Sequence, residues 1–385
     1  MTFRVTVVGA GIVGLSAAWA LWRDGHQVTV YEQKALPNSL GSSVDQHRLI
    51  RYPYGSELGY TRMVADAYQA WEKLWTDINK KLYAPTGTLV LAKTGESWAN
   101  DSADTLGQLG LSVQWLDADQ LQDTFPLLVA DGVESAFYLD SGGVLLADQI
   151  ITAMVQHLNS RGVTFHTQVQ VREIVPDLAR IVLSNGIVVD ADTLVVAAGP
   201  WVTRLLPDLS QRVTPSRQVV VYLEPPPDKI AQWIAAPMIL DIDPDSGFYL
   251  VPPVLGTELK IGDHRFTLTG DPDCEREAGE AEARAIFEQC KQRLKEFDRY
   301  RLQRSCTCFY TVAPQERFIV ERLGNSWLMT GFSGHGFKFG PLLGLALAEA
   351  VAGRRTANDL SQWAAGHAIL DFGFCEKLRA GVPPR

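Results

Sequence analysis

A glycine-rich turn near the start of the chain constrains its fold more than any other feature. Gly9, Gly11 and Gly14 form a G-x-G-x-x-G pattern between two apolar stretches, residues 4–8 and 12–22. The first glycine allows a sharp turn, the second lets a phosphate approach the backbone, and the third lets a helix pack closely on a strand. The pattern therefore predicts a strand, a turn and a helix that together seat a dinucleotide pyrophosphate.

An acidic residue follows where such a site needs one. The next predicted strand, 27–31, leads into Glu32, near the roughly 20-residue offset at which a carboxylate binds ribose hydroxyls. Ile12 and Val13 begin the predicted helix, so their backbone N–H groups are expected to face the pyrophosphate. Because an acid at Glu32 disfavours a 2′-phosphate, the sequence favours FAD or NAD over NADP.

The later part of the chain contains two segments that predict different kinds of sheet. Residues 213–310 combine short predicted strands, proline-rich turns and a charged helix, which indicates an antiparallel sheet with flanking helices. Before them, a buried apolar strand begins at Thr193 and runs into Gly199. Since open α/β sheets bind ligands at the carboxyl ends of parallel strands, Gly199 is expected to lie at the cofactor.

We therefore predict an α/β fold in which a Rossmann-like nucleotide-binding domain receives an inserted α+β substrate domain with an antiparallel sheet. The nucleotide-binding domain is assigned to residues 1–82, 141–212 and 311–385, and the substrate domain to residues 83–140 and 213–310. The substrate domain is expected to cover the cofactor.

Three local patterns give sharper predictions of secondary structure. Apolar residues at helical spacing predict an amphipathic helix over 57–79, and a charged stretch predicts a helix over 275–297. Asn185-Gly186 between apolar runs predicts a hairpin.

Charge and cysteine content exclude several classes of protein. A net charge of −9 and a pI near 5.3 argue against a nucleic-acid-binding or anionic-membrane surface. Five cysteines without a C-x-x-C pair suggest neither a disulfide framework nor a metal site. With no predicted targeting segment or bilayer-spanning stretch, we expect a cytoplasmic protein whose partners are small molecules.

Two arginines stand among aromatic residues in the loop after Glu32. If the segment is extended, the odd offset between Arg48 and Arg51 points them to opposite faces, so one could serve the cofactor and the other a substrate. The alternative is that both pair with surface carboxylates.

Lys338 stands in an electrostatically awkward place. It precedes an apolar helix that opens near Pro341, and the positive end of a helix dipole disfavours a nearby cation. A substrate carboxylate or a reduced cofactor would compensate its charge.

Together with Cys308-Phe-Tyr310-Thr and Gly331-Phe-Ser-Gly-His335-Gly-Phe-Lys338, these features make the chain resemble the monomeric sarcosine oxidase family. Its members are flavoenzymes of the D-amino-acid-oxidase-like superfamily that oxidise N-methyl and related secondary amino acids. The similarity runs essentially end to end in motif order, and the last segment is its most specific part.

The resemblance implies that the cofactor is FAD and assigns residues to it. Cys308 falls where the family joins its thiol covalently to the flavin 8α-methyl group. Arg48 matches the arginine against the flavin ring, and His335 matches a ring-side histidine. Gly334 and Gly336, in the last segment, are expected to contact the cofactor. A cation near Cys308 would favour the thiolate that the linkage needs.

The resemblance also implies a substrate site. Arg51 and Lys338 match the pair that clamps the substrate carboxylate, with Lys338 also reaching the cofactor. Lys260 matches the lysine near flavin N5, where oxygen is thought to react; its alternative is a solvated strand lysine. Tyr249 and Tyr310 match pocket aromatics.

The chain departs from the family beside the flavin. Val44 stands where a histidine is usual, which puts sarcosine itself in doubt, and His47 is a candidate partial substitute.

The predicted activity is the FAD-dependent oxidation of a secondary, N-methyl or otherwise N-substituted, α-amino acid by oxygen in a monomeric enzyme. The products would be an imine, then aldehyde and amine, and hydrogen peroxide. The alternatives are a fructosyl-amino-acid or cyclic imino-acid oxidase, an amino-acid dehydrogenase that passes electrons to a carrier, and a non-catalytic nucleotide-binding sensor.

Overall fold

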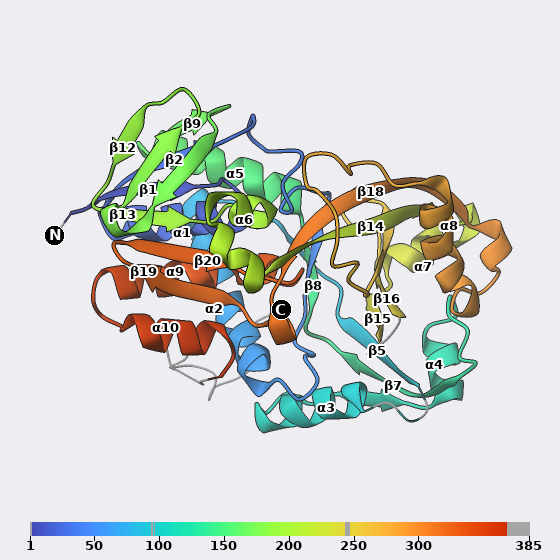
Figure 1. The fold of residues 1–385 in the computed structure, drawn as a ribbon. Coiled ribbons are helices and arrows are strands. Elements are labelled where there is room, and N and C mark those ends of the chain that lie inside the picture. Colours follow the sequence, from blue (N-terminus) through green and yellow to red (C-terminus); the bar gives the residue numbers. More distant parts are fainter. Residues whose placement is uncertain (1, 94, 96, 243–246, 368–385) are drawn as a thin grey trace.

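The structure is a computed structural model that describes residues 2–93, 95, 97–242 and 247–367. Two large sheets dominate it, and two three-stranded sheets complete the β structure of the described residues. Figure 1 shows one large sheet with its helices near the N-terminus and the other on the opposite side of the molecule, with the long strands β14 (Thr214–Glu224) and β18 (Arg301–Val312) at its edge.

The six-stranded sheet is built from the predicted strand–turn–helix. Gly9 adopts φ +100° between strand β1 (Arg4–Val8) and helix α1 (Ile12–Arg23), as the sharp turn requires. The sheet is parallel except for the edge strand β19. Its strand order is β19 (Ile319–Leu323), β20 (Ser326–Thr330), β13 (Thr193–Val196), β1 (Arg4–Val8), β2 (Gln27–Glu32) and β9 (Thr164–Thr167).

Helices cover this sheet and carry the later site segments. Helix α9 (Gly340–Val351) packs closely on α1, because a Cβ on Gly344 would lie 2.2 Å from the Ser16 carbonyl oxygen. Helix α2 (Leu58–Ile78) confirms the predicted amphipathic helix. The remaining helices on this side are α5 (Ala147–Ser160), α6 (Val202–Leu205) and α10 (Ala357–Ala364).

The eight-stranded sheet pairs its neighbours antiparallel except β15 with β5. In spatial order its strands are β18 (Arg301–Val312), β14 (Thr214–Glu224), β17 (Leu259–Asp263), β16 (Gly247–Val251), β15 (Met238–Ile242), β5 (Thr88–Lys93), β7 (Val133–Leu139) and β6 (Gln114–Leu116). Its helices are α3 (Trp98–Gln108), α4 (Ala118–Thr124), α7 (Ile230–Ile234) and α8 (Glu280–Gln289). We retain the domain division by residue range as a proposal.

Two small sheets complete the fold. The predicted hairpin at Asn185-Gly186 joins β11 to β12, in a sheet of β10 (Val171–Val175), β11 (Arg180–Leu183) and β12 (Val188–Asp190). The second small sheet brings the arginine segment beside two later strands; it contains β3 (Arg48–Ile50), β8 (Gly143–Leu145) and β4 (Tyr83–Pro85).

Two predictions for residues 213–310 are wrong in extent. The charged helix covers only α8, because the chain after it turns to bury Arg293, whose Nε donates to Asp241 at 2.7 Å, and Glu296 adopts a left-handed φ of +57°. The strands there are not all short, since β14 and β18 pair with each other along nearly their whole lengths.

Within the described ranges, no helix is both long enough and apolar enough to cross a bilayer. The same residues contain no group of three or more His, Cys, Asp or Glu side chains placed to hold a metal ion.

Candidate active site

Two adjoining cavities bring the predicted site residues together. The turn cavity contains the predicted cofactor residues Gly9, Gly11, Ile12, Val13, Glu32, Gly199, Gly334 and Gly336. The basic cavity contains Arg51, Tyr249, Lys260, His335 and Lys338. Their shared wall is formed by Arg48, Tyr310, Ser333, Gly334 and Phe337.

The turn cavity fits a dinucleotide cradle. A Cβ on Gly9 would lie 2.3 Å from the Ala197 carbonyl oxygen, and a Cβ on Gly14 would lie 1.9 Å from the carbonyl oxygen of Gly9. Gly14 does not line the cavity; it brings α1 against the turn, as predicted. A side chain at either position would therefore push the turn or the helix away and change the shape of the hollow at the helix N-terminus.

Glu32 and the first helical residue have protein partners at this hollow. One carboxylate oxygen of Glu32 accepts the Ala10 N–H at 2.9 Å, and the other accepts the Asn38 side-chain amide at 2.9 Å. The Ile12 N–H donates to the Ser43 hydroxyl at 2.9 Å. The sequence reasoning missed Ser43, which lies in a loop without a periodic pattern.

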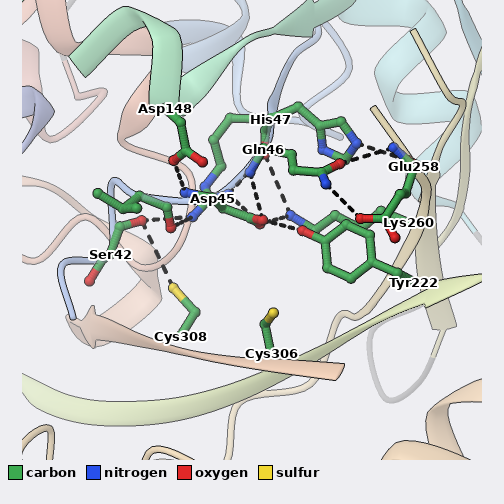
Figure 2. A network of polar contacts seen from close by, with 12 residues as sticks. Ser42, Asp45, Gln46, His47, Asp148, Tyr222, Glu258, Lys260, Cys306 and Cys308 are labelled. Atoms are coloured by element: carbon green, nitrogen blue, oxygen red, sulfur yellow. Dashed lines mark hydrogen bonds and ion pairs between the residues drawn. The ribbon is translucent and has the colours of Figure 1, made fainter. Parts of the chain in front are cut away.

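A buried charge network stands at the junction of the two cavities (Figure 2). The Asp45 carboxylate accepts hydrogen bonds from Lys260 Nζ, from Tyr222 Oη and, at 2.7 Å, from Arg48 Nη1. Although burial favours the protonated acid, Lys260 and Arg48 hold the pKa of Asp45 well below its usual range. Asp45 in turn raises the pKa of Arg48 against the opposing effect of burial.

The network shows that Lys260 is not a solvated strand lysine. It lies in β17, is only 2% exposed, and points its Nζ at Asp45. The backbone of Asp45 is fixed as well, because its N–H donates to the Asp148 carboxylate at 2.5 Å. No motif or spacing in the sequence marked Asp45 or Tyr222, since four separate chain segments meet only in the folded protein.

Cys308 lies on β18, directly before Phe309 and Tyr310, which line the turn cavity. It shares a strand face with Cys306, and its thiol donates to the Ser42 carbonyl at 3.9 Å. Burial raises the pKa of Cys308. Arg48 lies close enough to lower that pKa, as expected of a nearby cation, but it only partly opposes the effect of burial. Cys306 is not a purely apolar neighbour, because Arg304 Nη1 lies 2.9 Å from its sulfur.

The basic cavity places Arg51 and Lys338 around one tyrosine ring. Arg51 Cζ lies 4.8 Å and Lys338 Nζ lies 5.1 Å from the centroid of the Tyr54 ring. The Trp71 indole of α2 donates to the Lys338 carbonyl at 2.7 Å and so fixes its backbone. Within the described chain neither of these basic side chains makes an ion pair, so the alternative of surface pairing is wrong for Arg51.

Arg48 and Arg51 differ in the cavities that they line, as their odd offset suggested. Arg48 lines both cavities, whereas Arg51 lines only the basic cavity. Sequence reasoning missed other residues that line the basic cavity, namely Tyr54, Glu57, Trp98, His264, Phe266 and Glu316. Of these, Tyr54 stood within the aromatic arginine segment, which was the available signal.

His47 is a buried histidine that predicts a loss of stability in mild acid. Burial, and then Lys260, lowers its pKa to about 4, from a usual value of 6.5. Between these values the folded protein binds fewer protons than the unfolded chain. The free energy of unfolding should therefore fall as the pH drops from about 6.5 to about 4, by up to roughly 3 kcal/mol.

Urea denaturation across this pH range would measure the effect. His47→Gln should lose most of the slope that His47 contributes, and the exposed control His367→Gln should keep it. Equal slopes in His47→Gln and the parent protein would contradict this assignment.

Comparisons with known proteins agree with this arrangement. Residues 4–350 match the family described as FAD dependent oxidoreductase. The chain is 30% identical to monomeric sarcosine oxidase of Bacillus sp. (strain B-0618), over 93% of this chain and 94% of that protein. It is 27% identical to N-methyl-L-tryptophan oxidase of Salmonella dublin, over 94% and 98% of the two chains.

A solved structure extends the likeness to the fold. NikD, described as an unusual amino acid oxidase essential for nikkomycin biosynthesis, superimposes with a TM-score of 0.79. The match covers 96% of this chain and 98% of NikD at 22% identity, and at that identity it shows a shared fold and nothing more.

Proposed function

Because this chain belongs to the FAD dependent oxidoreductase family, among the sarcosine oxidases, we propose that it oxidises secondary α-amino acids carrying an N-methyl or other N-substituent. One observation carries the proposal. Two basic side chains without ion pairs in the described chain, Arg51 and Lys338, line a cavity that shares a wall with the turn cavity. A planar guanidinium and an ammonium suit a carboxylate.

The residues divide the work of binding and orientation. Gly9, Gly11 and Glu32 would hold the dinucleotide part of FAD, and Arg48 would lie beside its ring. When bound, FAD would supply the oxidising power for a two-electron oxidation of the substrate, with oxygen as the proposed final acceptor. Arg51 and Lys338 would fix the carboxylate, which orients the reacting C–H bond toward the shared wall and supplies much of the rate.

The substrate class is tested by anaerobic bleaching of the flavin absorbance. A panel would contain N-methyl, cyclic and glycated amino acids, with the corresponding amines lacking a carboxylate as controls. Bleaching by N-methyl amino acids but not by their decarboxylated counterparts is expected. Preference for cyclic or glycated compounds would reassign the substrate, and no bleaching by any amine would leave only a non-catalytic nucleotide-binding protein.

Oxygen is proposed as the electron acceptor, with Lys260 near the reaction. A cation held in a dry site stabilises the negative charge that develops as oxygen is reduced. Lys260→Met should therefore slow reoxidation by oxygen about 10²–10³-fold, while anaerobic reduction by substrate changes much less.

Stopped-flow mixing with oxygen and a peroxide assay would measure this effect. Lys229→Met is the matched control, since Lys229 is another buried lysine, 3.3 Å from the Glu296 carboxylate. A parent enzyme that produces no peroxide would identify a dehydrogenase instead.

A covalent bond between FAD and Cys308 is proposed from the position of its thiol. Cys308 directly precedes Phe309 and Tyr310, which line the turn cavity, and its sulfur contacts Ser42 of the same lining. Acid precipitation of the parent protein should leave a yellow pellet, and Cys308→Ser should leave a white pellet. Cys306→Ser, two residues along the same strand face, is the matched control and should stay yellow. A colourless parent pellet would refute the linkage without refuting FAD binding.

We further propose a monomer in the cytoplasm. The relatives of this chain include enzymes named monomeric, and its acidic composition without a cysteine framework suits a reducing compartment. Light scattering coupled to size-exclusion chromatography would test the first point, and cell fractionation the second.

A further inference from the structure

The hydrogen bonds of Lys338 identify where its protons are. The side chain is buried, with only 4% of the residue exposed. Its Nζ donates to Tyr54 Oη at 2.8 Å and to the His335 carbonyl at 3.2 Å. Two acceptors therefore take two hydrogens, and the remaining tetrahedral position of Nζ is left for the basic cavity that Lys338 lines.

The direction of the first of these bonds follows from His335. Its Nε2 lies 3.1 Å from the Glu316 carbonyl oxygen, which can only accept, so Nε2 carries the hydrogen. Burial, and then Lys338, lowers the pKa of His335 well below its usual value, which leaves Nδ1 bare. Tyr54 Oη lies 3.0 Å from Nδ1 and must donate to it. The Tyr54 oxygen is then free to accept from Lys338.

The surroundings of Lys338 disfavour a third proton while the cavity holds no anion. Burial, and then Arg51, lowers the pKa of Lys338 well below its usual value, with Glu316 opposing. Glu57 also lines the cavity, but its carboxylate pairs with Arg317 at 2.6 Å. The other ionisable groups of the lining are His47, Arg48, Tyr60, Tyr249, Lys260, Asp263, His264 and Tyr310.

We propose that Lys338 is neutral in the resting site and accepts the ammonium proton of the zwitterionic amino acid when the carboxylate binds. One N–H bond of the substrate ammonium breaks, one N–H bond forms at Lys338 Nζ, and the freed electron pair stays on the substrate nitrogen. The amine thereby becomes neutral, as its oxidation requires, and the carboxylate gains a cation. The substrate class rests on the proposed function; Tyr54 and His335 act as positioning residues.

The test measures proton uptake by the FAD-loaded protein. Titration calorimetry with 2-furoate, a carboxylate without an amine, would be run in phosphate and in Tris, whose ionisation enthalpies differ. Because furoate brings no proton, up to one proton per furoate should be drawn from the buffer, most completely at a pH between the pKa of Lys338 in the resting site and its pKa in the complex. Across the uptake range the affinity should fall about tenfold per pH unit as the pH rises.

A second probe identifies the source of the proton. 2-Aminoisobutyrate carries an ammonium but no α-hydrogen and no N-methyl group, so it binds without being oxidised. Its ammonium should supply the proton itself, and its binding should draw none from the buffer. Uptake from the buffer with both probes would overturn the proton transfer from substrate to lysine.

Variants separate Lys338 from its surroundings. Lys338→Met should bind furoate more weakly, with no proton uptake and no pH slope, whereas Lys291→Met, an exposed lysine, should behave as the parent. Tyr54→Phe keeps the ring but removes one acceptor of the charged form, so its uptake range should move to lower pH. An unchanged range in Tyr54→Phe would overturn the positioning role.

Two failures remain distinguishable. Furoate binding without proton uptake at any pH between about 6 and 10 would overturn this inference alone. Absence of furoate binding would overturn the carboxylate clamp of the proposed function as well.

Discussion

Arg51→Met is expected to lower kcat/KM for the amino-acid substrate about 10²–10³-fold, mainly through a higher KM. Arg51 is a cation without an ion pair in the described part of the basic cavity, so in the variant the substrate carboxylate would lose a charge-assisted, two-pronged hydrogen bond. Such bonds contribute roughly 2–4 kcal/mol when the carboxylate is otherwise desolvated. Steady-state kinetics with the substrate found by anaerobic bleaching would measure the loss.

Arg51→Lys is the informative companion variant. It keeps a positive charge but loses the planar fork, so it should recover only part of the activity. The FAD content of both variants should match the parent, because Arg51 does not line the turn cavity. Full activity in Arg51→Met would remove Arg51 from substrate binding.

Gly14→Ala is expected to cost the protein most of its flavin. A Cβ at this position would lie 1.9 Å from the carbonyl oxygen of Gly9, and only backbone movement of α1 or of the turn could relieve the clash. The hollow that holds the pyrophosphate would change shape, and flavin per protein should fall by about tenfold or more. The ratio of flavin to protein absorbance would report it.

Gly107→Ala is the matched control for this change. Gly107 also lies in a helix, α3, and a Cβ there would have open space around it. This variant should keep its flavin and its stability, since alanine is a better helix former than glycine. A fully yellow Gly14→Ala protein would contradict the close packing of helix and turn.

The sequence predicted those parts of the molecule that depend on neighbouring residues. The turn at Gly9, the helix α2 and the hairpin at Asn185-Gly186 all follow from local backbone needs or periodicity, and all are present. The family match confirms the predicted FAD and amine oxidoreductase class. Roles of single residues in the site stay predictions.

What the sequence could not predict depends on distant segments meeting. Asp45 accepts hydrogen bonds from Tyr222 and Lys260, which follow it by 177 and 215 positions. No residue near Asp45 in the sequence predicts either contact. The predicted length of α8 was wrong because Arg293, which follows the helix, is buried against Asp241, a residue distant in the sequence. Nothing in the sequence indicated that burial would raise the pKa of Cys308 by more than Arg48 lowers it.

Whether a residue lines one cavity or both determines how freely it can be substituted. Arg48 and Tyr310 line both cavities, so a substitution at either must be compatible with both the turn cavity and the basic cavity. Trp98, His264 and Phe266 line only the basic cavity. A lineage, or a mutagenesis library, can therefore vary these three to accept new side chains on the amine without dismantling the compartment that houses the coenzyme.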